Sequence, residues 1–287
     1  MPPITLPAPG AAPARPAAAA LLGEAPLTAE HFERIATMLH EHAGIRLREG
    51  KEGLVRARLA KRLRALGLGD FDRYLAHVES ERSRAEFTEM VDALTTNKTS
   101  FFREHSHFDV LREQVLPASQ GALRLWSAGC SSGEEAYTMA MVLHESLDSA
   151  SASRARILAT DISHRVLAVA KAGRYSAETL ADVPKALLQK YWRPLDGGAR
   201  YEAGPALRQL VQFGRLNLMA QWPMRGPFDA IFCRNVMIYF DKSTQQQLVE
   251  RYRQLLRPGG YLFVGHSESL TGLSHQYRYI QPAVYAR

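Results

Sequence analysis

The segment 129–135, GCSSGEE, joins a predicted buried strand, Leu123–Ala128, to a strongly helical stretch. Its two glycines let the backbone turn sharply and come close to a ligand. Their Gly-x-x-x-Gly spacing differs from the Gly-x-Gly-x-x-Gly of dinucleotide enzymes, and two carboxylates at the start of a helix repel a pyrophosphate but attract a cation. The segment therefore predicts a turn that faces a positively charged ligand, although a glycine turn with two helix-capping carboxylates explains it equally well.

Asp161 follows the second predicted strand, Arg156–Thr160, where nucleoside-binding sheets carry an acid that accepts hydrogen bonds from both ribose hydroxyls. The same carboxylate could instead cap the helix expected to begin near His164. Together with the glycine turn and Glu135, Asp161 suggests a site for S-adenosylmethionine, whose sulfonium is a cation. Other nucleosides remain compatible with these residues.

Arg234 and Asn235 interrupt the apolar run Phe228–Phe240 just where its strand should reach the ligand. An unpaired arginine is costly to bury, so Arg234 either meets a ligand or forms a structural salt bridge. Methyltransferases that act on the amino groups of nucleic-acid bases carry Asn/Asp-Pro-Pro-aromatic at this place, and the sequence has no such tetrapeptide. This difference argues against a DNA or RNA base as substrate.

The segment Thr95–Glu104, TTNKTSFFRE, is polar and then abruptly aromatic. It could cover the cofactor with amide, hydroxyl and guanidinium groups while Phe101 and Phe102 anchor it in the core. An ordinary interdomain connection with a hydrophobic staple is the alternative.

These segments need a parallel sheet to bring them together, and short strands that alternate with helices beyond Gly121 predict one. The expected strands are Leu123–Ala128, Arg156–Thr160, Phe228–Cys233, Tyr261–Gly265, Gln276–Ile280 and Ala283–Ala286. The expected helices are Glu134–Leu147, His164–Ala172 and Ser243–Leu256. The fold class is thus α/β.

The predicted domain order is a Pro/Ala-rich disordered tail over 1–27, a helical domain over 28–94, a linker and helix over 95–120 and an α/β domain over 121–287. A small antiparallel β insertion is expected over 190–215, where Asp-Gly-Gly and Gly-Pro turns break the alternation. In the helical domain, apolar residues recur at helical spacing from Thr28, a candidate N-cap, to Gly44.

Composition limits the class of protein. The 287 residues carry a formal net charge of +7, which favours an acidic partner surface, protein or nucleic acid. No apolar run approaches the roughly 18 residues of a membrane helix, so no membrane insertion is expected. Cys130 and Cys233 form no CxxC pair, which predicts a reducing compartment and no metal site.

The five stretches that carry the argument together resemble the CheR family, chemotaxis methyltransferases that esterify glutamate side chains of chemoreceptors. They are Thr95–Glu104, Trp126–Glu135, Ala159–Ile162, Phe228–Asp241 and Gly265–Glu268. The resemblance spans roughly Leu27 to Tyr285. It implies a class I S-adenosylmethionine-dependent methyltransferase domain, with a mostly parallel sheet whose last strand is antiparallel, preceded by a small all-α domain.

The resemblance also implies roles for single residues. The cofactor, whose product is S-adenosylhomocysteine, would be bound by Asn97, Thr99, Arg103, Glu135, Asp161, Asn217, Leu218, Cys233 and Arg234. Arg103 and Tyr239 would orient the substrate carboxylate and so act in catalysis. A glutamate side chain, with a reference pKa near 4.3, is already an ionised nucleophile at neutral pH and needs no general base.

Eight basic and only two acidic residues lie between Arg46 and Arg64. On a helix they suit an acidic helical bundle, although a solvated basic helix is the simpler interpretation. The resemblance favours docking of the cytoplasmic helical bundle of methyl-accepting chemotaxis proteins through Arg58, Lys61 and Arg62. It also implies a cytoplasmic monomer.

The inserted sheet corresponds to the part that in some family members binds a receptor's C-terminal pentapeptide by strand addition. Here its turn, Pro194–Gly198, departs from the glycine spacing of those members. Two other functions remain open on the residues alone. One is a nucleic-acid methyltransferase, favoured by the net charge, and the other is a non-catalytic cofactor-sensing scaffold.

Overall fold

The computed structural model describes residues 25–80, 84–119 and 121–287; the tail expected over 1–27 lies mostly outside them. The helical domain consists of α2 (Ala29–Ala43), α3 (Glu52–Leu66), α4 (Phe71–Glu79) and α5 (Arg84–Leu94). Thr28 caps α2 by accepting a 3.2 Å hydrogen bond from the backbone N–H of His31, and Gly44 ends it with φ 69°. The predicted start and end of this helix are confirmed.

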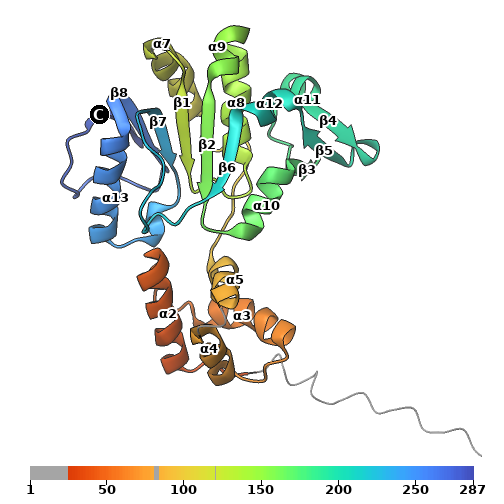
Figure 1. Ribbon diagram of the computed structural model, residues 1–287, viewed down its shortest axis with the longest axis vertical. Coiled ribbons are helices and arrows are strands. Elements are labelled where there is room, and N and C mark those ends of the chain that lie inside the picture. The colour runs from red at the N-terminus through yellow and green to blue at the C-terminus, as the bar shows by residue number, and fades with distance from the viewer. Residues whose placement is uncertain (1–24, 81–83, 120) are drawn as a thin grey trace, which may run out of the picture.

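The second domain is built on a seven-stranded sheet in the order β6-β2-β1-β7-β8-β10-β9 (Figure 1). The first five of these strands are parallel, and β10 runs antiparallel to β8. The bounds are β1 (Arg124–Ala128), β2 (Arg156–Asp161), β6 (Val211–Arg215), β7 (Phe228–Cys233), β8 (Leu256–Val264), β9 (Arg278–Gln281) and β10 (Val284–Ala286). The predicted α/β fold class, with a mostly parallel sheet, is confirmed.

Helices cover both faces of this sheet, because successive strand residues point to opposite sides. Leu125 of β1 belongs to one apolar cluster and the neighbouring Trp126 to the other. The first cluster includes α8 (Glu134–Ser146) and the second includes α13 (Lys242–Leu255). The remaining helical elements are α6 (Ser106–Val110), η2 (Leu111–Val115), α7 (Leu116–Ala118), α9 (Ser149–Arg154), α10 (His164–Ala172), α11 (Lys185–Tyr191), α12 (Pro205–Leu210) and the short turns η3 (Asp196–Gly198) and η4 (Met237–Tyr239).

A second, three-stranded antiparallel sheet has the order β3-β5-β4, with β3 (Arg174–Ser176), β4 (Trp192–Leu195) and β5 (Arg200–Ala203). The expected insertion is therefore present, but the range 190–215 was wrong at both ends. It omits β3 and includes β6, which pairs with β2 in the main sheet. The error has a local cause, since β6 is a short, half-exposed edge strand with a mixed sequence, VQFGR.

The helical domain lies beyond the carboxyl ends of the parallel strands, at the lower end of the view in Figure 1. Parallel sheets bind ligands at that edge, so the fold places the two domains on either side of the expected site. Among the described residues, no helix is both long and apolar enough to cross a membrane.

Candidate cofactor-binding and active site

A cavity of about 400 Å³ lies between the strand ends and the helical domain. Its volume falls within the usual range of small-molecule sites. Three regions line it: the strand-end loops, the linker that follows α5, and the segment between α2 and α3. The lining includes nine of the ten residues predicted for cofactor binding and catalysis: Asn97, Thr99, Arg103, Glu135, Asp161, Asn217, Leu218, Arg234 and Tyr239.

The glycine turn after β1 adopts a conformation that other residues could not adopt without strain. Gly129 has φ 92°, and a Cβ built there would lie 2.4 Å from Val236 Cγ2. Gly133 has φ 98°, and its Cβ would lie 2.9 Å from the Cβ of Ala170. Left-handed φ and close packing both require glycine at these two positions. The turn is thereby held against the strand ends while its backbone lines the cavity.

Asp161, at the end of β2, hydrogen-bonds to the same turn. Its Oδ2 accepts a 2.9 Å hydrogen bond from the Ser131 N–H, and its Oδ1 accepts one of 2.9 Å from the Ser163 N–H. Burial raises the pKa of this carboxyl above its ordinary value, against the lowering effect of the backbone donors. Asp161 does not cap α10, because Ser163 is the residue whose side chain accepts from that helix, at Val166.

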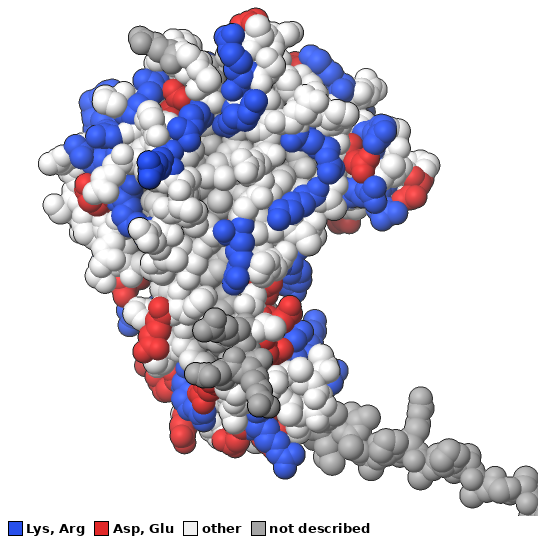
Figure 2. Space-filling model, viewed as in Figure 1, with Lys and Arg blue, Asp and Glu red and all other residues white. Residues whose placement is uncertain are grey.

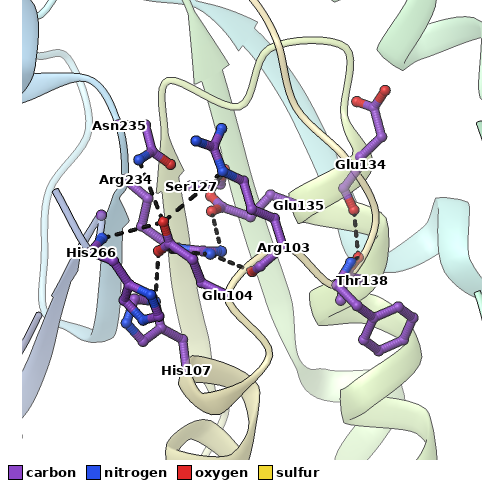
Figure 3. Close-up of polar contacts among 12 residues, drawn as sticks. Arg103, Glu104, His107, Ser127, Glu134, Glu135, Thr138, Arg234, Asn235 and His266 are labelled. Atoms are coloured by element: carbon purple, nitrogen blue, oxygen red, sulfur yellow. Dashed lines mark hydrogen bonds and ion pairs between the residues drawn. The ribbon is translucent and has the colours of Figure 1, made fainter. Parts of the chain in front are cut away.

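Arg234 is the centre of a buried charged cluster (Figure 3). Its side chain is only 3% exposed and forms 3.0 Å ion pairs with Glu104 Oε2 and Glu135 Oε2. It also donates to the backbone carbonyl of Arg103. Glu135 accepts a further 2.6 Å hydrogen bond from Ser127 Oγ. Arg234 is thus both a structural salt-bridge partner and part of the cavity lining, so the two predicted alternatives do not exclude each other.

The two carboxylates of this cluster differ in their titration. Burial raises the pKa of Glu135, and the nearby Arg234 only partly opposes that effect. Burial also acts to raise the pKa of Glu104, but the Arg234 guanidinium and the backbone N–H of His266 outweigh it, so the pKa of Glu104 is lowered. Both carboxylates pair with Arg234, and Arg103 Nε lies 4.0 Å from Glu104 Oε1, so two arginines balance the two carboxylates of the cluster.

The linker covers the cavity and is anchored at two points. Phe101 is buried edge-on against Tyr175 and Trp192, with ring centroids 5.2 and 5.3 Å away. At the other point, Ser131 Oγ donates a 2.8 Å hydrogen bond to the backbone carbonyl of Asn97. These contacts keep Asn97 and Thr99 in the cavity lining, in accordance with the expected covering role.

The two residues predicted for catalysis lie at the cavity under the same linker. Arg103 Nη1 donates a 3.0 Å hydrogen bond to the carbonyl of Lys98, and its side chain remains 37% exposed. The Tyr239 hydroxyl lies 3.4 Å from the carbonyl of Thr96. Arg103 Nε also lies 4.0 Å from Glu104 Oε1, but both donors face backbone carbonyls for which a substrate carboxylate can substitute.

Of the other residues predicted to bind the cofactor, Asn217 and Leu218 line the cavity and Cys233 does not. Asn217 Nδ2 donates a 2.6 Å hydrogen bond to the carbonyl of His42, and this bond connects the sheet domain to α2. The Cys233 side chain is fully buried on the face of the sheet under α13, 3.2 Å from the Tyr252 hydroxyl. The structure therefore does not bring the Cys233 side chain to the site.

The three basic residues predicted for docking differ in how far their side chains are already engaged within the protein. Arg58 donates to the carbonyls of Leu94 and Thr95 at 2.8 and 3.1 Å. Arg62 forms an ion pair of 2.5 Å with the buried Glu86. Lys61 is exposed and has no ion pair within the described parts of the chain. Only Lys61 of the three keeps its charge wholly available to a partner.

Sequence reasoning assigned no role to two acidic residues that shape the site. Glu104 is the second carboxylate of the Arg234 cluster, and it is the last residue of the segment Thr95–Glu104. Glu268 accepts hydrogen bonds from the backbone N–H groups of Asn235, Ile238 and Gly265 and so fixes the bend after β7. Both act through partners far along the chain. The only available signal was their place within the motifs.

Two family models match the chain, and together they cover both domains. "CheR methyltransferase, SAM binding domain" matches residues 97–286, and "CheR methyltransferase, all-alpha domain" matches residues 30–95. This chain belongs to the CheR methyltransferase family. The predicted family is thereby confirmed, and with it the division into a helical domain and a domain that binds S-adenosylmethionine.

Curated relatives agree with that assignment over almost their whole lengths. The chain is 42% identical to the chemotaxis protein methyltransferase of Salmonella typhimurium and 43% identical to that of Escherichia coli, each over 265 residues that cover 91% of both chains. It is 43% identical to chemotaxis protein methyltransferase 2 of Pseudomonas aeruginosa over 267 residues, 90% of this chain and 93% of the relative.

The cavity fits S-adenosylmethionine, the cofactor of this CheR domain. Its lining holds the carboxylates of Glu135 and Asp161, which suit a cationic ligand and the hydroxyls of a ribose. Gly129, whose backbone lines the cavity, has no room for a side chain because Val236 packs against it. These residues would hold the cofactor at the carboxyl edge of the sheet.

Proposed function

We propose that this protein transfers the methyl group of S-adenosylmethionine to glutamate side chains of chemoreceptors, and so acts as a protein-glutamate O-methyltransferase. The observation that carries the proposal is the cavity itself, which holds the carboxylates of Glu135 and Asp161 at the carboxyl edge of the sheet, in a chain of the CheR family. The names of the relatives, chemotaxis protein methyltransferases, support the receptor as acceptor.

Methyl transfer to a glutamate side chain requires little proton transfer by the protein. A glutamate carboxylate is ionised at neutral pH and attacks without a general base, given its reference pKa near 4.3. The bound cofactor supplies a methyl carbon made electrophilic by its positively charged sulfur. The protein's own contribution is therefore orientation and exclusion of water, and orientation alone is able to contribute up to about 7–11 kcal/mol.

Arg103 and Tyr239 are the residues that we propose orient the acceptor carboxylate. Their hydrogens now point to the backbone carbonyls of Lys98 and Thr96, within the linker that covers the cavity. A carboxylate is a stronger acceptor than a backbone carbonyl, because its charge strengthens the hydrogen bond. An incoming glutamate would replace those carbonyls as the partner of both donors.

Docking of the receptor's helical bundle is proposed for the exposed side of α3. Lys61 offers a free cation there, and Arg58 and Arg62 add positive potential while their side chains hold the linker and α5. Binding of a receptor's C-terminal pentapeptide at an edge of the three-stranded sheet, a cytoplasmic location and a monomeric state remain predictions.

A nucleic-acid substrate is less well supported. In the view of Figure 2, basic side chains over the sheet domain are separated by neutral surface, and over the helical domain they alternate with acidic ones. A continuous basic groove, which a phosphate backbone would require, is not what this face presents.

The test uses the purified full chain, S-adenosylmethionine with a labelled methyl group, and membranes that contain chemoreceptors. We expect label on the receptor that leaves as methanol under mild base, because a carboxyl methyl ester hydrolyses in this way. Tyr239→Phe should lower the rate, whereas Tyr279→Phe, at an exposed tyrosine of β9, should not. Label that resists mild base, or label found on added RNA instead, would contradict the proposal.

A further inference from the structure

His107 is a buried histidine whose ring is not used by the site described above. It lies on α6 with a fully buried side chain. Neither of its ring nitrogens has a hydrogen-bond partner within the described residues. A buried polar group in this state is unusual, since nearly all such groups in proteins are paired. The ring therefore points to a partner that the polypeptide does not provide.

Two further ligand-type side chains face this ring (Figure 3). Glu104 Oε2 lies 3.5 Å from His107 Nδ1, and the ring of His266 stands nearly perpendicular to that of His107 with centroids 4.9 Å apart. One donor atom from each of the three residues lies within 4.8 Å of the other two. Glu104 precedes α6 and lies three positions before His107, whereas His266 follows β8, which comes from a distant part of the sequence.

Backbone contacts already hold the three groups together. The His266 N–H donates a 3.2 Å hydrogen bond to Glu104 Oε1. Glu104 itself has φ 54°, a left-handed conformation that directs its side chain toward α6 and Arg234. The His266 side is exposed to solvent, so an ion can enter from outside and retain a water ligand.

Some of the nearby charges oppose cation binding beside Glu104, and others favour it. Arg234 lies 3.0 Å from the same carboxylate oxygen and repels a positive ion. Arg103 Nε also lies 4.0 Å from Glu104 Oε1, while Glu135, the second carboxylate on Arg234, offsets part of the positive charge.

We propose that Glu104, His107 and His266 form a binding site for a divalent transition metal of the zinc type, beside the cofactor cavity. Two imidazoles and one carboxylate are a usual Zn²⁺ ligand set, with bonds of about 2.0–2.2 Å and a fourth position for water. The ligand atoms must approach by about an ångström to reach that geometry, which rotation of the exposed His266 side chain allows.

The site is coupled to the cofactor through Glu104, which the metal and Arg234 share. A cation bound there places extra positive charge next to the cavity wall. Zn²⁺ therefore weakens binding of S-adenosylmethionine more than binding of S-adenosylhomocysteine, because only the former carries the positive sulfonium. By linkage, the methyl donor weakens zinc binding by the same factor.

The test titrates Zn²⁺ and Co²⁺ into chelator-treated, untagged protein, by calorimetry and by visible absorption. Wild type should bind one ion per chain, and its Co²⁺ form should show the strong visible bands of a four-coordinate site. Because even loss of a supporting residue around a metal costs 10–100-fold in affinity, His266→Gln should weaken binding by at least about tenfold. His107→Gln, with folding checked by circular dichroism, should do the same.

The matched control is His105→Gln, an exposed histidine two positions from His107. It should leave zinc affinity unchanged. No 1:1 binding by wild type, or equal losses in His105→Gln and His266→Gln, would overturn the site and show only adventitious surface binding. Equal affinity for S-adenosylmethionine with and without saturating Zn²⁺ would overturn the coupling.

Discussion

The strand-end wall of the cavity and the helical domain hold their charged side chains in different ways. On the strand-end wall, Arg234 is almost completely buried and pairs with two carboxylates. In the helical domain, on α3 and outside the cavity lining, Arg58 is only partly buried and donates to neutral backbone carbonyls, while Lys61 remains exposed. The comparison separates two tasks. The strand-end wall holds its charges in buried pairs beside the proposed cofactor site, and we propose that the helical domain meets the acceptor protein through its exposed charges.

The largest difference between the two regions should appear on removal of a guanidinium. Arg234→Met leaves Glu104 and Glu135 without their buried partner, and breaking such a pair costs about 3–5 kcal/mol. Arg58→Met removes hydrogen bonds to neutral carbonyls and should cost about 1 kcal/mol of unfolding free energy. Urea denaturation of both variants measures this, and equal losses would break the comparison.

Asp161→Asn should weaken S-adenosylhomocysteine binding without comparable loss of fold. Hydrogen bonds to a charged group are worth about 1.5–3 kcal/mol, which corresponds to about 10- to 150-fold in dissociation constant. The exposed Asp182 provides the control, because Asp182→Asn alters the same charge far from the cavity lining. Calorimetric titration compares the two, and a similar affinity for both would remove Asp161 from the site.

Acid should weaken cofactor binding before it unfolds the strand-end wall. Burial raises the pKa of both Asp161 and Glu135, so these carboxyls take up protons at a higher pH than exposed ones do. Protonation removes the negative charge that we expect the ligand to contact, so affinity should fall as the pH is lowered from about 7 toward 5. Titrations across this range test the sign. Tighter binding at low pH would contradict it.

The smallest expected effect lies in the helical domain. Lys61→Glu should reduce receptor methylation a few-fold and weaken its dependence on salt, because exposed charges steer association through screened interactions. Affinity for S-adenosylhomocysteine should stay the same. Lys171→Glu, at an exposed lysine of α10, is the matched control. Equal methylation rates in the two variants would show that α3 does not meet the receptor.

The two regions also differ in how well the sequence predicts them. Gly129, Glu135 and Asp161 lie in strand-turn-helix segments whose local pattern determines both structure and position. Helix α10 accordingly has the predicted bounds, His164–Ala172. Local patterning failed for β6, whose five residues become a strand only because β2 offers an edge.

Roles that depend on tertiary partners could not be derived from the sequence. Arg58 and Arg62 sit on one basic helix, yet their partners, the linker carbonyls and Glu86, come from other elements. Cys233 is the last residue of the expected strand, and the alternation of that strand turns its side chain away from the cavity toward Tyr252. The ring of His107 gains its significance only beside His266, after the chain has folded.

The central claim is that the cleft between the helical domain and the strand ends binds the methyl donor. Isothermal calorimetry with S-adenosylhomocysteine tests it most directly, in wild type and in Asp161→Asn. The account predicts one molecule bound per chain, displaced by S-adenosylmethionine and weakened by the substitution. Absence of binding heat together with absence of any thermal stabilisation by either ligand would contradict it.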